Sequence, residues 1–539
     1  MLKASNISKS YADRTILDGV SFVVNAGECS GIVAPNGAGK TTLLRILAGR
    51  LSADGGSVET GGRAGVSYVR QGFADVAGRS IGTVFPALFR ARAVSARIEA
   101  AAGALAQASE RDALAAAQRE YGEAVESAGT EAPWLAADWA ELGLREISRE
   151  ELVSSLSGGE QTKLALLDAF SSRPDVLLLD EPTNNLDMRA AQWLTGRLDA
   201  FEGAIVLVSH DRALLDEHAD FIVELDQRTG RAAVYSGGYS EYAAEKVRRR
   251  DAQWTAFRRQ QERERRVRRE IHDIKGTAMR REKSSQNDFY RRKAKKVARR
   301  AVVLERRLER ELGSEEHVDK PVMREYTLKT EIRPASRGGD RMLAVEEVAV
   351  AAGGRELVAN ASFQLGWGER AVIIGPNGAG KTTLVRAIVG EEAPKAGRIV
   401  LGPSVEIGYL AQDERLEAMS AVGGTPVSLL RATAPLSETE ARRFLHRFLF
   451  EGDAVHTPIG SLSYGERRRL SLALLVLGGA NLLVLDEPTN HLDIPSREAL
   501  EAALDSYDGA ILAVTHDRYF IDRFAQRLLE LEGGRLREV

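Results

Sequence analysis

The sequence predicts an α/β protein with two domains built on mixed and parallel sheets and joined by an antiparallel, coiled-coil-like linker of two helices. First, one set of short motifs occurs twice in the same order, which indicates a duplicated domain. Second, apolar runs such as Val176–Leu179 and Ile511–Val514 have the length and composition of strands buried on both faces. Third, residues 240–312 carry apolar side chains at alternating spacings of three and four, which is the seam of a helical pair.

The two motif sets keep constant offsets. Lys40 and Lys381 are 341 residues apart, whereas Ser157 and Ser463 are 306 apart, so the first copy holds 35 additional residues. These fall within residues 85–130, where Ala, Arg and Glu dominate and a helix or helical hairpin is expected. Two interpretations stay open: an arm that touches a partner, or a lengthened helical subdomain.

The following boundaries are therefore expected: a first domain over 1–240, a helical linker over 241–325 with its tip near 276–288, a connector over 326–340, and a second domain over 341–539.

Composition excludes several classes of protein. The chain has 539 residues and no apolar run near the roughly 18–20 residues that span a bilayer, so no membrane association is expected. Its single cysteine, Cys29, rules out an internal disulfide and, with an N-terminus that lacks a signal peptide's apolar core, indicates the cytoplasm.

Charge is distributed unevenly. Residues 246–310 contain 25 Lys and Arg against 9 Asp and Glu, a net of +16, which leaves −19 for the rest of the chain. Such a basic block between acidic domains indicates a polyanionic partner. The alternative is a solvated spacer, which gives no reason for so dense a positive charge.

Each motif set opens with a phosphate loop, APNGAGKTT (34–42) and GPNGAGKTT (375–383), that follows an apolar run and precedes an apolar helix. Successive N–H groups of such a loop surround the phosphates of a nucleotide, and its lysine adds a point charge. The residues expected to bind ATP here are Asn36, Gly37, Gly39, Lys40, Thr41, Thr42, Asn377, Gly378, Gly380, Lys381, Thr382 and Thr383. Thr41 and Thr382 would also give a hydroxyl to Mg²⁺. Ala34 replaces the first glycine of the pattern and would strain the loop if that position requires a positive φ.

The apolar runs that end in Asp-Glu carry the chemistry of hydrolysis. Asp180 and Asp486 are expected to hold Mg²⁺, and Glu181 and Glu487 to activate the attacking water as general bases. The remaining candidates recur in both copies: His210 and His516 for the γ-phosphate, and Gln71 and Gln412 for sensing Mg²⁺ and water.

With the LSGGEQ (156–161) and LSYGER (462–467) segments added, the motif series resembles that of ATP-binding cassette ATPases. The chain resembles the ABC-F subfamily in having two cassettes, the DEPTNHLD motif and a charged helical linker. The resemblance implies two composite ATP sites closed head to tail within one monomer. Lys40, Thr41, Glu181 and His210 would face Ser463, Gly465 and Glu466, while Lys381, Thr382, Glu487 and His516 would face Ser157, Gly158, Gly159 and Glu160.

The same resemblance makes the two sites unequal. Tyr11 stands where the family stacks an aromatic ring on adenine, and the second cassette has Ala352 there. Asn185 replaces the histidine that His491 keeps, and Tyr464 interrupts the second signature motif where the first has Gly158. Both glutamates are present, so hydrolysis is expected at both sites.

ABC-F proteins act on ribosomes, so the resemblance implies rRNA and P-site tRNA as partners of the linker. The RNA-binding candidates are Lys283, Arg291, Arg292, Lys293, Lys295, Lys296, Arg299 and Arg300. Antibiotic resistance by ribosome protection is favoured, because the chain ends at Val539 without the further coiled coil of some housekeeping members. A housekeeping translation factor and the ATPase subunit of a transporter are the alternatives.

Overall fold

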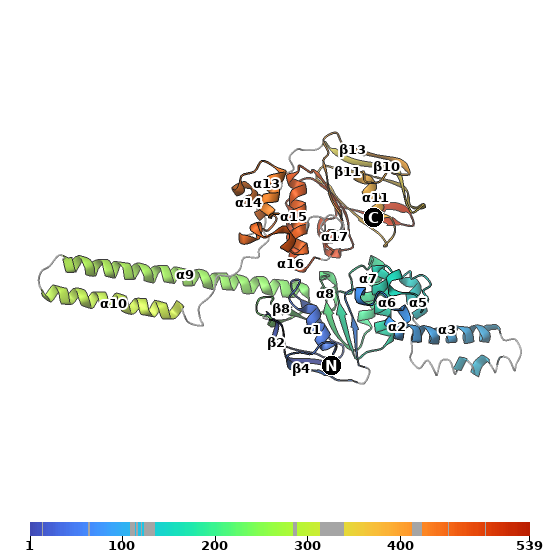
Figure 1. Cartoon of the computed structure of the whole chain (residues 1–539), viewed down its shortest axis with the longest axis horizontal. Helices are drawn as coiled ribbons and strands as arrows, with labels where there is room; N and C mark the ends of the chain where they lie inside the picture. The colour runs from blue at the N-terminus through green and yellow to red at the C-terminus, as the bar shows by residue number, and fades with distance from the viewer. Residues whose placement is uncertain are drawn as a thin grey trace. The chain divides into compact units, whose positions relative to one another are not determined.

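A computed structural model gives the fold of the chain. It describes residues 1–12, 14–62, 65–107, 114, 117–119, 121–122, 135–283, 288–312, 339–411, 423–450, 452–490 and 492–539. Its contacts divide the chain into two units, one made of Met1–Tyr239 and Tyr326–Val539 and the other of Ser240–Glu325. The first unit holds both motif sets, and the second holds the two helices of the linker (Figure 1).

The first cassette is built on a six-stranded sheet in the order β5-β6-β7-β3-β8-β9. All neighbouring strands are parallel except β9, which runs antiparallel to β8. Their bounds are β3 Cys29–Val33, β5 Val66–Val69, β6 Val176–Asp180, β7 Ala204–Val208, β8 Phe221–Leu225 and β9 Ala232–Ser236. Every residue of β3, β6 and β7 is buried, which explains their unbroken apolar runs.

A smaller antiparallel sheet of order β2-β1-β4 completes this cassette, formed by β1 Leu2–Tyr11, β2 Arg14–Val24 and β4 Gly55–Thr60. The helices are α1 Lys40–Leu47, α2 Ile81–Val84, α3 Pro86–Gln107, α5 Leu135–Glu141, α6 Gly158–Ser171, α7 Met188–Asp199 and α8 Arg212–His218, with 3₁₀ turns η1 Ala74–Val76 and η2 Val153–Ser155. Apolar residues of α1 and of both sheets share one core, which includes Leu43 of α1, Ile7 of β1 and Ile32 of β3.

The second cassette repeats this plan, with sheets of order β14-β15-β16-β12-β17-β18 and β11-β10-β13. Its strands are β10 Arg341–Ala352, β11 Arg355–Gly366, β12 Arg370–Ile374, β13 Ala396–Leu401, β14 Ile407–Leu410, β15 Leu482–Asp486, β16 Ala510–Val514, β17 Arg527–Glu532 and β18 Arg535–Glu538. Its helices are α11 Lys381–Ile388, α13 Pro426–Thr433, α14 Glu438–Arg447, α15 Tyr464–Leu477, α16 Ile494–Asp505 and α17 Arg518–Phe524, with 3₁₀ turns η3 Gly452–His456 and η4 Ile459–Ser461. The prediction of two α/β domains with mixed sheets is confirmed.

Helix α3 is the longest described part of the additional segment expected over 85–130. Its first turn packs into the cassette, because Leu88 is fully buried and its N–H donates to the Asp168 carboxylate of α6 at 2.8 Å. Most of residues 108–134 lie outside the described residues, so the choice between an arm and a longer subdomain stays open.

The second unit contains α9 Tyr239–Lys283 and α10 Asp288–Leu312, which run antiparallel and side by side (Figure 1). Ile271 of α9 and Ala301 and Leu308 of α10 are buried, and Lys275 and Glu305 form an ion pair at 2.5 Å from one helix to the other. The expected tip near 276–288 includes 284–287, and the expected connector 326–340 is mostly 326–338; both segments lie outside the described residues. Within the described residues, none of the helices has the length and apolarity that crossing a bilayer requires.

Candidate functional site

Each phosphate loop joins a buried central strand, β3 or β12, to the helix that begins at its lysine. Gly39 and Gly380 cap these helices with φ of 100° and 101°, a conformation that L side chains rarely adopt. A Cβ on Gly39 would also lie 2.5 Å from Ile16, so the glycine is required for space as well. The two loops therefore enter their helices in the same conformation for the same local reason.

The lysines of both loops are buried and turn back over their own loops. Lys40 Nζ donates to the Ala34 carbonyl at 2.9 Å, and Lys381 Nζ donates to the Gly375 carbonyl at 2.7 Å. Burial lowers the pKa of Lys40, and the neighbouring Glu181 carboxylate opposes that shift. The ammonium group of each lysine thus lies against its own phosphate loop. It adds positive charge to the N–H groups that would surround phosphate.

The loops differ at their first residue. Gly375 has φ 147°, and a Cβ there would lie 2.2 Å from the Leu531 carbonyl oxygen. Ala34 is buried and is not among the residues with positive φ. The first loop therefore has a different backbone conformation at this position, and Ala34 does not bring the strain that a positive φ would cause.

The Asp-Glu pairs lie at the carboxyl ends of β6 and β15, beside the phosphate loops. Glu181 and Glu487 have φ of 53° and 47°, which is the left-handed region. The backbone N–H of each glutamate donates at 2.9 Å to the carbonyl of the last residue of the adjacent strand, Val208 or Val514. Strained backbone of this kind is concentrated at functional sites because the surrounding structure must impose it.

A histidine faces each glutamate. His210 Nε2 lies 3.2 Å from Glu181 Oε1 and 3.1 Å from Lys40 Nζ, and the backbone N–H of His210 donates to Glu181 Oε2 at 3.1 Å. In the second cassette His516 Nε2 lies 3.6 Å from Glu487 Oε1. Both copies therefore bring together the lysine, the glutamate and the histidine that the sequence predicted.

Burial sets the protonation of these groups. It raises the pKa of Glu181 to about 7, with Lys40 opposing, and raises the pKa of Glu487 to about 8, with Lys381 opposing. Burial also lowers the pKa of His210 well below its usual value and that of His516 to about 4. The site thus pairs neutral imidazoles with carboxyls whose pKa values lie near neutral pH, as a general base requires.

The aspartates have unpaired oxygens that suit a cation. Asp180 Oδ2 accepts from the Tyr68 hydroxyl at 3.1 Å, while its buried Oδ1 has no hydrogen-bond partner among the described residues, and neither oxygen of Asp486 has one there. In the same part of the chain no group of three His, Cys, Asp or Glu could hold a metal alone. This donor set fits Mg²⁺, which usually takes one or two protein ligands together with water and phosphate oxygens.

The signature motifs begin helices α6 and α15 through matching capping boxes. Ser157 accepts from the Glu160 N–H, and the Glu160 carboxylate accepts from the Ser157 N–H and hydroxyl at 2.8 Å each. Ser463 and Glu466 repeat these contacts. A helix N-terminus with free N–H groups is a binding site for anions.

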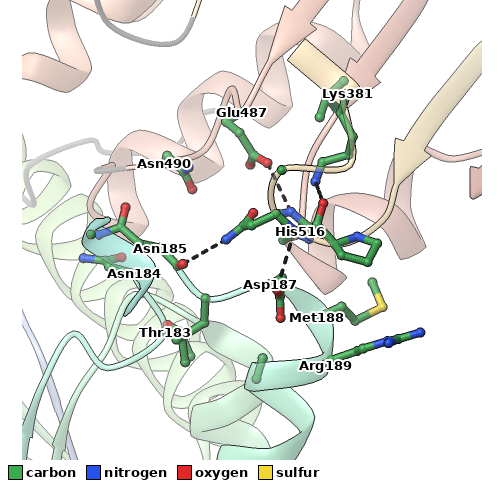
Figure 2. Close-up of a pocket in the computed structure, with 18 of the residues that line it drawn as sticks. Thr183, Asn184, Asn185, Asp187, Met188, Arg189, Lys381, Glu487, Asn490 and His516 are labelled. Carbon is green, nitrogen blue, oxygen red and sulfur yellow. Dashed lines mark hydrogen bonds and ion pairs between the residues drawn. The ribbon is translucent and has the colours of Figure 1, made fainter. Parts of the chain in front are cut away.

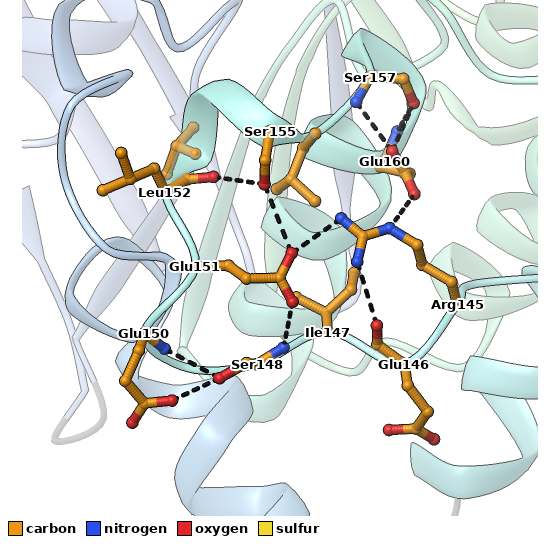
Figure 3. Close-up of polar contacts among 12 residues, drawn as sticks. Arg145, Glu146, Ile147, Ser148, Glu150, Glu151, Leu152, Ser155, Ser157 and Glu160 are labelled. Atoms are coloured by element: carbon orange, nitrogen blue, oxygen red, sulfur yellow. Dashed lines mark hydrogen bonds and ion pairs between the residues drawn. The ribbon is translucent and has the colours of Figure 1, made fainter.

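Polar contacts tie the first signature motif to the preceding loop (Figure 3). Arg145 Nε lies 3.4 Å from Glu160 Oε1, and its guanidinium forms an ion pair with Glu151 at 2.9 Å. Glu151 in turn accepts from the Ser148 N–H at 2.7 Å. The orientation of the Ser157–Glu160 turn is thereby fixed by residues of its own cassette.

The predicted second ATP site corresponds to a composite pocket of about 760 Å³ within the first unit (Figure 2). Its lining from the first cassette includes the signature residues Ser157, Gly158, Gly159 and Glu160, and its lining from the second includes Asn377, Gly378, Gly380, Lys381, Thr382, Thr383, Glu487 and His516. The predicted facing residues of this site are therefore brought into one cavity.

The first site is a smaller pocket of about 310 Å³. It is lined by Tyr11, Ile16, Asn36, Gly37, Gly39, Lys40, Thr41, Thr42, Gln71, Asp180, Glu181, Asn184 and His210. Ser463, Gly465 and Glu466, which were predicted to face these residues, do not line it. Tyr11 is half exposed at the rim, as an adenine-stacking ring would be, and its pairing with a nucleotide stays a prediction.

The sequence interpretation missed the aspartates that follow each Asp-Glu motif. Asp493 Oδ2 accepts from the N–H of Asn36 at 3.0 Å, and Asp187 Oδ2 accepts from that of Asn377 at 3.5 Å. Asn377 also donates to the Asn185 carbonyl at 3.0 Å. Each phosphate loop is therefore held by the other cassette, and only the repetition of Asp187 and Asp493 in register could have indicated it.

Several predicted residues, or their side chains, lie outside the described part of the chain. Gln412 and His491 lie outside the described residues. Lys283 falls on α9, and Arg291, Arg292, Lys293 and Lys295 fall on α10, with side chains that are likewise outside the described part. Lys296, Arg299 and Arg300 are exposed on α10, and Arg300 lies 3.7 Å from Glu270 of α9.

Phosphate loops, Asp-Glu strand ends and helix-capping signature motifs in this arrangement define an ATPase of the ATP-binding cassette class. Comparison with known proteins agrees, since the family described as "ABC transporter" matches residues 17–184 and 358–490. Relatives include the tylosin resistance ATP-binding protein TlrC of Streptomyces fradiae, 35% identical over 99% of this chain and 97% of its own length. ABC transporter F family member 2 of Arabidopsis thaliana is 32% identical over 99% of this chain and 77% of its own.

The chain belongs to the F subfamily of ATP-binding cassette ATPases, and it is an ATP-hydrolysing enzyme. The energy-dependent translational throttle protein EttA of Mycobacterium tuberculosis is also similar, at 33% identity over 98% of this chain and 90% of its own. A solved structure titled "RNase-L Inhibitor" shares the fold, with a TM-score of 0.55 at 20% identity over 99% of this chain and 90% of its own.

Proposed function

We propose that this protein is a ribosome-binding ATPase that closes its two cassettes over two ATP molecules and presents its basic linker to ribosomal RNA. The composite pocket carries the proposal, because a signature helix and a phosphate loop from different cassettes line one cavity. Relatives named for ribosome protection and for translational throttling support the choice of partner. This role would be carried out in the cytoplasm by a monomer.

ATP would lie with its phosphates on the N–H groups of each phosphate loop and on the loop's lysine, Lys40 or Lys381. Mg²⁺ would be held by Thr41 and Asp180 at the first site and by Thr382 and Asp486 at the second. There it would neutralise phosphate charge. The signature N-terminus of α6 would hold the γ-phosphate at the second site. For the first site, α15 would do the same once the cassettes close further.

Hydrolysis would use the glutamates as bases. Glu181 and Glu487 would take a proton from the water that attacks the γ-phosphate, since their raised pKa values make them better proton acceptors than ordinary carboxylates. His210 and His516, held neutral by burial, would orient the water and donate to the phosphate. Gln71, which lines the first pocket, would sense Mg²⁺ and water there.

The linker would bind RNA through α9 and α10. Residues 246–310 carry a net charge of +16, and phosphate binding releases counterions from RNA, so affinity should fall steeply with salt. Lys296, Arg299 and Arg300, exposed on α10, would contact the phosphates of rRNA and of P-site tRNA.

Within this role we favour antibiotic resistance by ribosome protection. Two relatives have names that support it, the tylosin resistance protein and the ribosome protection protein VmlR of Bacillus subtilis, which is 32% identical over 98% of this chain and 86% of its own. The throttle protein EttA supports a second candidate, control of elongation. Resistance predicts that expression restores translation in a drug-inhibited extract without changing drug uptake by cells.

Co-sedimentation with purified ribosomes tests the proposal. The Glu181→Gln, Glu487→Gln double variant should stay closed with ATP and sediment with ribosomes at low salt, and less at high salt. The matched control is the same variant with ADP. Absence of any ATP-dependent association would remove the ribosome from the proposal and favour a role as a transporter's ATPase subunit.

A further inference from the structure

A buried arginine lies directly behind the second catalytic centre. Arg468 of α15 is fully buried, and its Nη2 donates to the carbonyl oxygens of Asp486 at 3.0 Å and Glu487 at 2.6 Å. These are the two residues that carry the proposed cation and base functions. A guanidinium in this place fixes the backbone between them, because it presents donors in a rigid planar fork.

That backbone is the part of the site that needs support. Glu487 is in the left-handed region with φ 47°, and its carbonyl also accepts from the Asn490 N–H at 3.3 Å. A residue in this conformation is strained and persists only where surrounding contacts impose it. The two arginine bonds are contacts of that kind, since they act on the carbonyls on both sides of the strained residue's N–Cα bond.

The same arginine is bonded to the signature motif. Its Nη1 donates to the Tyr464 hydroxyl at 2.9 Å, one helical turn away on the same face of α15. Tyr464 is the residue of LSYGER that directly follows the capping Ser463. One side chain therefore contacts both the start of the signature helix and the catalytic strand end.

The first cassette has other residues at the two equivalent positions. At the offset of 306 residues, Gly158 replaces Tyr464 and Thr162 replaces Arg468. Thr162 Oγ1 donates to the Gly158 carbonyl of its own helix at 3.1 Å. Glu181 holds its φ of 53° with a carbonyl that accepts from Asn184 at 3.2 Å.

We infer that Arg468 is a positioning residue for hydrolysis at the second ATP site and that, through Tyr464, it ties this site to the signature motif of its own cassette. In the composite arrangement, on which this inference rests, that motif faces the first ATP. Nucleotide engagement at the first site would thereby adjust the geometry of Glu487. Gly158 and Thr162 offer no such bond, so the corresponding positions of the first cassette do not tie Glu181 to its own signature motif.

The test measures each site separately. Glu181→Gln leaves turnover to the second site, and Glu487→Gln leaves it to the first. In the first background, Arg468→Met should lower kcat about ten-fold or more and leave KM for ATP within about two-fold, because the base is misplaced while the phosphate loop is intact. Arg468→Lys should lower kcat less than Arg468→Met does.

Tyr464→Phe removes only the bond to the signature motif and should lower second-site kcat by about two- to five-fold. The matched control is Thr162→Val in the Glu487→Gln background, which should leave first-site kcat unchanged. If Arg468→Met does not fold, as judged by its melting temperature, Arg468→Lys and Tyr464→Phe carry the test.

Three results would overturn the inference: equal loss of turnover at both sites in Arg468→Met, a rise in KM that matches the fall in kcat, or a second-site kcat that Tyr464→Phe leaves unchanged. Failure of the underlying proposal looks different. If the Glu181→Gln, Glu487→Gln protein still hydrolyses ATP, the assignment of the bases is wrong, whatever the Arg468 variants do.

Discussion

The left-handed glutamates are the most specific residue-scale feature of the site. Glu181 and Glu487 are the residues that leave the core strands β6 and β15, and each donates its N–H to the adjacent strand at 2.9 Å. This bond turns the chain sharply, so the carboxylate enters the pocket while the strand stays buried. Strain at the residue is the cost of placing a charged group at the end of an apolar strand.

Turnover at each site should increase with pH across neutrality. Burial raises the pKa of Glu181 to about 7 and that of Glu487 to about 8, and a general base acts only when deprotonated. Activity is therefore present above these pKa values and is lost as the pH falls through them. Pre-steady-state ATP turnover between about pH 6 and 9 in single-glutamate variants measures this. A rate that stays constant or declines with rising pH would contradict it.

The first residue of each phosphate loop gives a matched pair of substitutions. Gly375→Ala should reduce second-site turnover by about ten-fold or more, because its Cβ would lie 2.2 Å from the Leu531 carbonyl oxygen and φ 147° disfavours alanine. Ala34→Gly, at the equivalent position, should change first-site turnover little, since Ala34 needs no positive φ. Equal effects of both substitutions would show that the two loops share one conformation after all.

At the scale of elements, a buried ion pair joins the cassettes within the first unit. Arg212 of α8 pairs with Glu501 of α16, with Nη1 3.2 Å from Oε2, and stacks 4.5 Å from the ring centroid of Tyr519. The equivalent of Glu501 in the first cassette is Thr195, and Arg518, the equivalent of Arg212, lies 3.5 Å from the more exposed Glu217. The two sides of the cassette interface are therefore held unequally.

Glu501→Gln should destabilise the protein by about 3 kcal/mol, because removing one charge of a buried pair leaves the other uncompensated. Glu217→Gln is the control and should cost less than about 1 kcal/mol, because its pair with Arg518 is partly exposed to solvent. Urea unfolding followed by tryptophan fluorescence compares the two variants. Similar free energies of unfolding for both would contradict the difference in burial.

The elements whose cause is local could be predicted from the sequence. The strand, loop and helix around Lys40 and Lys381 follow from apolar runs, glycines and helix formers that lie next to one another in the chain. Contacts between distant segments could not, since the Asn36–Asp493 bond joins residues 457 positions apart and Arg468 donates to Asp486, 18 positions further along the chain. Tertiary packing decides which polar side chain forms a hydrogen bond with a distant backbone N–H or carbonyl group. The spacing of residues along the sequence does not indicate such a contact.

At the scale of the whole molecule, positive and negative charge are concentrated in different parts of the chain. The net +16 of residues 246–310 belongs to α9 and α10, while the rest of the chain, with a net of −19, carries the nucleotide chemistry. Acidic cassettes would be repelled by RNA, which supports the proposal that the linker makes the contact. The sequence could indicate this division because charge needs no fold to be counted.

The salt dependence of ATP-driven ribosome binding tests this account most directly. In the Glu181→Gln, Glu487→Gln background, replacing Lys296, Arg299 and Arg300 with Gln should reduce the slope of log affinity against log salt by about two to three. The control changes the same charge on the cassettes, at the exposed Arg14, Arg355 and Arg535, and should leave the slope unchanged. An unchanged slope for the linker variant, or an equal reduction for the control, would contradict the claim that the linker is the RNA-binding part of this ATPase.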